Sequence, residues 1–201
     1  MANNPYLTLS SPSSFTLATA NSTKNWDGTL EYCGDLDVDT WHTWDGTTTL
    51  NTASLKGEGN VIYLRGTGNT TITGNVAVAE NHMWVLNGTN ISCEGNIENL
   101  LDYSTVLNNE HPTMANGCFR DLFHGCTSLI TAPEFPATVL SGHCYAGTLS
   151  GCINLIEAPE LPATTLASNC YAWMFDGCSS LMTIHELPAT TLANYCYDHM
   201  F

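Results

Sequence analysis

The chain has 201 residues, enough for one large domain or two small ones with a substantial core. Hydrophobic residues make up 43% of the sequence and charged residues only 11%, a composition that excludes an intrinsically disordered chain. With 4 Lys and Arg against 19 Asp and Glu, the formal net charge of -15 repels phosphate backbones and anionic lipid heads, so we expect no nucleic-acid partner.

The start of the chain shows no secretory signal. Met1 and the residues after it contain no basic group, and no apolar stretch follows. No run approaches the roughly 20 apolar residues that a membrane helix needs, so we expect no membrane insertion. Three interpretations stay open: the chain remains inside a cell, leaves by lysis within a particle such as a virion, or has lost a targeting segment.

Residues 1–93 contain short Thr-rich and aromatic runs separated by Gly and Asn, which predict a small β-sandwich domain. Two Trp-Asp-Gly-Thr segments predict similar hairpin turns of the primed types. The candidate strands are residues 6–9, 15–17, 29–32, 61–64 and 83–86.

Three alternating carboxylates, Asp35, Asp37 and Asp39, lie on one side of a short segment and offer a possible calcium site. The central Gly and the closing Glu of an EF-hand loop are missing, so a charged hairpin tip is the favoured interpretation and we expect no metal. An enzyme would need a pocket lined by residues such as Asp37, Asp39 and His42, and this is the weakest of the functional hypotheses.

Residues 94–111 are predicted to be a helical cap or linker. Apolar residues at 97, 100 and 101 have helical spacing. An array of repeats exposes an apolar cross-section at its end, and this segment is well placed to cover the first repeat.

From residue 112 to residue 201 the sequence repeats every 26 residues. The period lies within the range of leucine-rich repeats, which predicts an α+β protein with a β-sandwich followed by a leucine-rich-repeat solenoid of 26-residue coils. The repeating columns are Cys118, Cys144, Cys170 and Cys196; Cys126, Cys152 and Cys178; Leu129, Leu155 and Leu181; and Pro136, Pro162 and Pro188.

Each repeat is predicted to hold a short helical segment and a short strand. In residues 170–175 the apolar positions mark one face of a helical turn, and Gly177 suits its C-terminal cap. Residues 178–184 fit the strand and bend of a coil, and Pro159 and Pro162 end the strand of the preceding coil because they lack a backbone donor.

The segment M-F-x-G-C-x-S-L followed by A-P-E-L-P-A-T-T-L resembles the BspA-type leucine-rich repeats of bacterial surface proteins. The resemblance covers residues 112–201 and departs from the pattern at residues 148–149 and 184–185. It implies adhesion or ligand binding by an array of coils, often on a cell surface, and it implies no catalytic residues.

The last repeat stops at Phe201 in mid-unit. We expect either that the array is truncated, which is favoured, or that another chain covers an uncapped coil. The open C-terminal coil would also permit self-association.

Seven of the nine cysteines belong to the repeat, and no C-x-x-C pair exists. Buried free thiols acting as small hydrophobic side chains are the favoured interpretation, ahead of disulfides and then of metal binding. Cys33 and Cys93, outside the repeat, could pair if their strands faced each other.

Two polar columns are the candidate ligand-binding residues. One column is acidic, and like charges at coil spacing repel unless water, a cation or a ligand intervenes. A solvated rim is the favoured interpretation of this column. The more specific alternative is a surface that binds a cationic or hydroxyl-rich ligand. The two columns are Glu134, Glu160 and Glu186, and Thr131, Glu157 and Thr183.

We therefore expect a binding or adhesion module that presents a repeat surface to a protein or glycan ligand, with no enzymatic activity and no cofactor. The alternative is a structural component of a phage tail or another extracellular assembly. An extracellular, cell-surface or virion location is favoured in either case.

Overall fold

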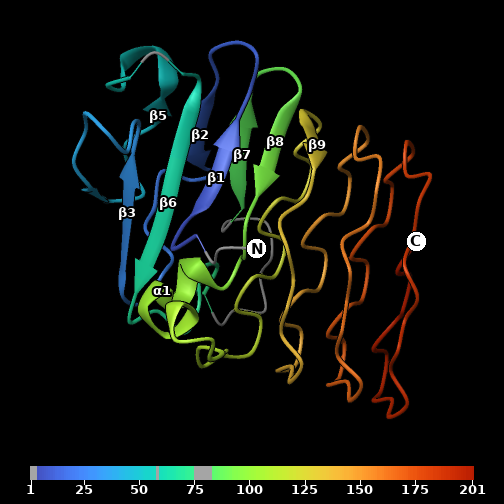
Figure 1. Cartoon of the computed structure of the whole chain (residues 1–201). Coiled ribbons are helices and arrows are strands. Elements are labelled where there is room, and N and C mark those ends of the chain that lie inside the picture. The colour runs from blue at the N-terminus through green and yellow to red at the C-terminus, as the bar shows by residue number, and fades with distance from the viewer. Residues whose placement is uncertain (1–3, 58, 75–82) are drawn as a thin grey trace.

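The structure, a computed structural model, describes residues 4–57, 59–74 and 83–201. Two β-sheets form one half of the molecule and stacked repeats form the other (Figure 1). One sheet has the strand order β4-β3-β6-β1-β8-β9 and the other the order β5-β2-β7. The strands are β1 (Leu7–Ser10), β2 (Thr16–Thr19), β3 (Thr29–Cys33), β4 (His42–Trp44), β5 (Leu50–Asn51), β6 (Val61–Thr67), β7 (Trp84–Asn87), β8 (Ile91–Glu94) and β9 (Leu129–Thr131).

Alternating side chains explain why these segments form strands with one buried face. Leu7 and Leu9 of β1 are fully buried, whereas Thr8 between them faces outward and lies opposite Tyr63 of β6. The five expected strands are present as β1, β2, β3, β6 and β7, and the two-sheet arrangement is compatible with the expected β-sandwich. The two Trp-Asp-Gly turns are not alike, since Gly46 has a positive φ and Gly28 does not.

The helix α1 (Asn99–Leu107) lies within the segment that was predicted to be a helical cap. It lies beside β6, where Leu100 approaches Gly66 so closely that no side chain fits at that glycine. Glu98, at its start, is buried against His111, with 2.8 Å between the carboxylate and Nδ1, and burial raises the pKa of this carboxyl group. In the described residues no helix has the length and apolarity to cross a membrane.

Backbone groups of the two-sheet half cover the first repeat directly. The amide of Ile72 donates to Cys118 O at 2.8 Å, and the amide of Trp84 donates to Leu122 O at 2.8 Å. Farther along the chain, β8 pairs in parallel with β9, which belongs to the first repeat. The two halves therefore share one sheet and a continuous ladder of hydrogen bonds.

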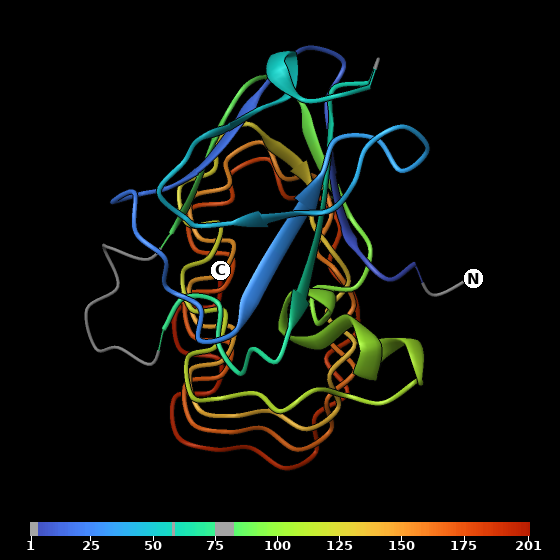
Figure 2. The ribbon, with the colours of Figure 1, turned by 90° about the vertical axis from the view of Figure 1, so that its left-hand side faces the viewer.

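Successive repeats bond to each other in the same register. Phe119 N donates to Cys144 O, Tyr145 N to Cys170 O and Tyr171 N to Cys196 O, each at 3.0 Å. Each bond joins residues 25 apart, so the repeats lie side by side and appear nested when viewed along the stack (Figure 2).

The expected α+β class and leucine-rich-repeat solenoid are wrong. In the described residues the fold is mostly β-strand in mixed sheets, with α1 as the one α-helix and a short 3₁₀-helix at Thr52–Ser54, and in residues 112–201 the only strand is β9 and no helix forms. Residues 170–175, expected to be helical, are consecutive turns. Every second amide there donates to the carbonyl three residues earlier, and the amides in between donate to carbonyls of the next repeat. Every fourth residue also has a positive φ. An α-helix, which needs i to i−4 bonds and right-handed φ values throughout, therefore cannot form.

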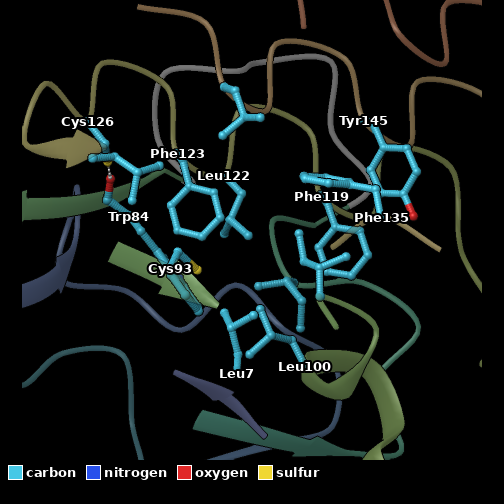
Figure 3. Close-up of a cluster of buried hydrophobic side chains, with 14 of the residues drawn as sticks. Leu7, Trp84, Cys93, Leu100, Phe119, Leu122, Phe123, Cys126, Phe135 and Tyr145 are labelled. Carbon is cyan, nitrogen blue, oxygen red and sulfur yellow. Dashed lines mark hydrogen bonds between the residues drawn. The ribbon is translucent and has the colours of Figure 1, made fainter. Parts of the chain in front are cut away.

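The two Cys columns and the Leu column, in which Leu181 is only partly buried, lie in one apolar core that continues into the two-sheet half (Figure 3), whereas the Pro column is half-buried. Phe119, Tyr145, Tyr171 and Tyr197 stack along it with ring centroids 5.8, 6.0 and 5.9 Å apart. Where the halves meet, the ring of Trp84 packs edge-on against Phe123 at 5.7 Å. The register of the repeat thus places like side chains in columns, as the spacing of the sequence predicts.

Candidate functional site

A cleft of about 430 Å³ lies at the outer face of the six-stranded sheet, where β1, β8 and β9 run side by side. Strand alternation puts Thr8 on this face, directly opposite Glu94 of β8. The lining residues are Asn4, Tyr6, Thr8, Cys93, Glu94, Gly95, Asn96, Thr131, Ala132 and Glu134.

The backbone around the cleft is held tightly. Thr131 Oγ1 accepts a hydrogen bond from Cys93 N at 3.1 Å, next to an irregularity in the β8–β9 pairing. Glu134 N donates to Gly95 O at 2.9 Å, and Gly95 has a φ of +92°. A Cβ at Gly95 would stand 2.9 Å from Tyr6 O, so only glycine allows the strands to approach this closely.

The side chains at the cleft combine an aromatic ring with polar groups and carry no positive charge. Glu94 and Glu134 are exposed, and within the described part of the chain neither carboxylate accepts a hydrogen bond or forms an ion pair. Tyr6 packs edge-on against Tyr63 at 5.0 Å, which fixes its ring beside the cleft. Such a surface offers hydrogen-bond acceptors and an apolar ring to one ligand.

The structure brings only two of the six predicted residues, Thr131 and Glu134, to this cleft. Thr131 uses its hydroxyl to join β9 to β8, while Glu134 leaves its carboxylate exposed. The other four, Glu157, Glu160, Thr183 and Glu186, follow on later repeats and are also exposed.

Those later residues do not form a second cleft of comparable size. Glu157 lies opposite Thr183 in a parallel bridge, and its carboxylate is 3.2 Å from His185 Nε2. Glu186 lines a crevice of about 10 Å³, which has room for about one water molecule. The acidic column is therefore spread along the stack.

Sequence reasoning missed the front-half contribution of Tyr6, Thr8, Glu94 and Asn96. The alternation in residues 6–9 does place Tyr6 and Thr8 on one face. No local signal shows that β1 and β8 become neighbours of the first repeat, because those pairings join residues far apart in the chain.

The Asp35, Asp37 and Asp39 segment forms a tight turn, in keeping with the favoured hairpin-tip interpretation. Asp35 Oδ1 accepts the amide of Asp37 at 2.9 Å. Asp39 lies 3.0 Å from His42 Nε2, and this hydrogen bond lowers the pKa of the Asp39 carboxyl to about 2. Across the described ranges no three His, Cys, Asp or Glu side chains converge as metal ligands, and neither cleft nor crevice is lined by Asp37, Asp39 or His42.

All nine cysteines are buried and unpaired, which confirms the favoured interpretation of buried thiols. The condition under which Cys33 and Cys93 could pair is not met, since β6 and β1 separate their strands. Burial raises the pKa of Cys126 to about 12 and that of Cys178 to about 11, so these thiols stay protonated. The Cys152 thiol donates to Phe123 O at 3.2 Å, a bond between successive repeats.

Comparisons with family models, with curated proteins and with solved structures find no significant match to this chain. The resemblance to BspA-type repeats therefore stays an expectation from the sequence, and the arguments about function rest on the geometry of the chain.

Proposed function

We propose that this chain is a non-catalytic binding module whose cleft between β1, β8 and β9 takes a hydroxyl-rich ligand of the glycan type. The observation that carries the proposal is the cleft of about 430 Å³ itself, in which a tyrosine ring lies beside unpaired carboxylates and a threonine hydroxyl. Its size is in the range of small-ligand sites, and polar groups beside an aromatic ring are typical of them.

Charge and rigidity also support a neutral glycan. The net charge of -15, together with Glu94 and Glu134 at the cleft, disfavours phosphorylated or sulfated ligands. Sugar hydroxyls can donate hydrogen bonds to these carboxylates, and charge-assisted hydrogen bonds are the stronger kind. Because the strands hold the cleft in a fixed shape, a ligand loses little binding free energy to ordering the site.

Binding of the full chain to a panel of neutral and acidic oligosaccharides, measured by calorimetry, tests the proposal. We expect Glu134→Gln to weaken binding of a neutral glycan about tenfold, the effect of losing one charge-assisted hydrogen bond of roughly 1.5 kcal/mol. The matched control is Glu160→Gln, which changes the equivalent exposed glutamate of the next repeat, outside the cleft.

Three outcomes would contradict the proposal. These are that no glycan binds, that Glu134→Gln and Glu160→Gln lose affinity equally, or that the bound glycan is cleaved. Release of new reducing ends over hours would mean that the carboxylates of Glu94 and Glu134 act as a hydrolytic pair.

A second candidate function, a structural component of an assembly, is favoured by the apolar side chains that residues 182–201 expose. Met182 is 81% exposed, Leu192 62% and Phe201 58%, and exposed apolar surface of this kind is typical of protein–protein contact regions. Sedimentation of the full chain over a hundredfold range of concentration distinguishes the two. A persistent monomer that binds a glycan excludes a role based on self-assembly alone.

A further inference from the structure

The outward side of the turns that connect successive repeats, which we name the turn face, has an unusual backbone pattern. Every fourth residue there has a positive φ, between 48° and 72°, a conformation that L-residues with side chains rarely adopt. The positions are Gly117, Asp121 and Gly125 in the first repeat; His143, Gly147 and Gly151 in the second; Asn169, Trp173 and Gly177 in the third; and Tyr195 and His199 in the fourth.

Two of these residues do not suit the conformation. Glycine adopts it freely, and Asn, Asp and His are the other residues found there most often. Trp173 and Tyr195 are bulky, whereas the equivalent positions of the other repeats hold only Gly, Asn, Asp or His: Asp121, Gly147 and His199 for Trp173, and Gly117, His143 and Asn169 for Tyr195. Both positions therefore cost conformational free energy that glycine would avoid.

Core packing does not explain these side chains. Trp173 is 41% exposed and Tyr195 is 68% exposed, although large aromatic rings contribute most to stability when buried. A strained position that also displays an exposed aromatic ring is the kind of outlier that points to function.

Three exposed rings, those of Trp173, Tyr195 and His199, lie on the turn face of the third and fourth repeats, and together with the partly exposed Asn169 we name them the aromatic patch. Trp173 stacks on His199 with ring centroids 5.9 Å apart and planes 19° apart. The amide of Trp173 donates to Asp198 O at 2.9 Å and that of Asn169 to Asn194 O at 3.0 Å. The ladder of backbone bonds thus holds the patch rigidly before any ligand arrives.

Carboxylates flank the patch. The Asp198 carboxylate lies 3.1 Å from His199 Nδ1, and Asp176 is exposed in the same set of turns as Trp173. These groups repel polyanions and can accept hydrogen bonds from hydroxyls, and the aromatic rings offer an apolar surface to the C–H faces of a sugar.

We infer that the aromatic patch is a second binding site on this chain and that its ligand is a neutral saccharide chain. The inference goes beyond the proposed function and does not rest on it, because the patch shares no residue with the cleft between β1, β8 and β9. A ligand that stacks on the patch runs along the third and fourth repeats.

The test is binding of the full chain to soluble neutral polysaccharides, measured by affinity electrophoresis and by tryptophan fluorescence. We expect Trp173→Asn to weaken binding at least tenfold and to change Tm by only a few degrees, since asparagine tolerates this backbone conformation, as Asn169 shows. The matched control, His143→Asn, has the same backbone conformation one repeat earlier, outside the patch, and should bind like the parent chain.

A second pair of variants keeps the test decisive if Trp173→Asn unfolds. Trp173→Phe and Trp173→Leu carry the same backbone strain, but only Phe keeps a ring, so Phe should retain affinity within about threefold and Leu should lose it. Equal binding by these two variants, or no saccharide binding by the parent chain, overturns the inference. Glu134→Gln reports on the cleft separately, so failure at one site is distinguishable from failure at the other.

Discussion

The two halves of the molecule form their backbone hydrogen bonds in different ways. In the two-sheet half, neighbouring strands come from distant parts of the chain, as when Leu7 pairs with Leu64 and Thr8 also pairs with Glu94. In residues 112–201 nearly every bond between repeats joins residues about 25 apart. The first arrangement depends on the whole fold, whereas the second needs only a neighbouring repeat in register.

The halves nevertheless share one core. A row of aromatic rings runs from Trp44 through Trp84 to Phe123, with centroids 5.7 Å apart at each step, and so crosses from the sheets into the first repeat. The difference in hydrogen bonding therefore does not separate two independent packing units. We expect the halves to unfold together, although their backbone hydrogen bonds follow different patterns.

The largest effect is expected where the halves meet. Phe123→Ala removes a fully buried ring beside Trp84 and should lower the free energy of unfolding by about 3–5 kcal/mol. Urea unfolding followed by tryptophan fluorescence and by circular dichroism measures the loss and should show one transition. Val139→Ala, at a side chain that is 82% exposed, should change it by less than about 0.5 kcal/mol. Two separate transitions in the parent chain would show that the halves are independent.

A smaller effect on the free energy of unfolding is expected when a glycine of each half is replaced by alanine. The two glycines have similar backbone conformations but different surroundings. Gly151 of the second repeat has a φ of +70°, and an added Cβ would stand 3.3 Å from the Cα of Gly125 in the repeat before it. Gly68 in the two-sheet half has a φ of +63° with open space around it.

Alanine should therefore cost about 1 kcal/mol at Gly68, from backbone strain alone, and about 2 kcal/mol at Gly151, from strain plus crowding between repeats. Thermal unfolding of the two variants measures the difference. Equal losses would mean that the repeats separate easily enough to accept a methyl group.

The smallest effect concerns the aromatic column of the repeats. The hydroxyl of Tyr171 is buried with no hydrogen-bond partner within the described structure, and the first repeat has Phe119 in the same column. Tyr171→Phe should leave stability unchanged or raise it by up to about 1 kcal/mol, because an unsatisfied hydroxyl is removed from the core.

The control for that variant is Tyr197→Phe, at a ring in the same column that is only partly buried, and its stability should not change. Urea titration compares the two proteins. A clear loss in Tyr171→Phe alone would show that the buried hydroxyl is satisfied by an internal water molecule.

Local pattern predicted several strands and the buried columns but not the fold class, and it predicted part of the candidate site. Alternation in residues 6–9 and 61–64 predicted β1 and β6, and the repeat predicted the buried columns of Cys, Leu and aromatic residues. Glu134 was identified because it recurs in the repeat, whereas Glu94, opposite Thr8 in the same cleft, belongs to no pattern. The prediction of a helical segment in residues 170–175 was wrong, because the buried turns found there space their apolar residues much as a short helix does.

The sequence by itself determined the 26-residue register, the residues that share each column and the strands with one buried face, because these depend on spacing and on side-chain character alone. Only the tertiary structure decided that the turns form no helix, that β8 joins β9 across the two halves, and that Tyr6 and Glu134 meet at one cleft. Those outcomes depend on backbone hydrogen bonds between distant segments, and such bonds leave no local trace in the sequence.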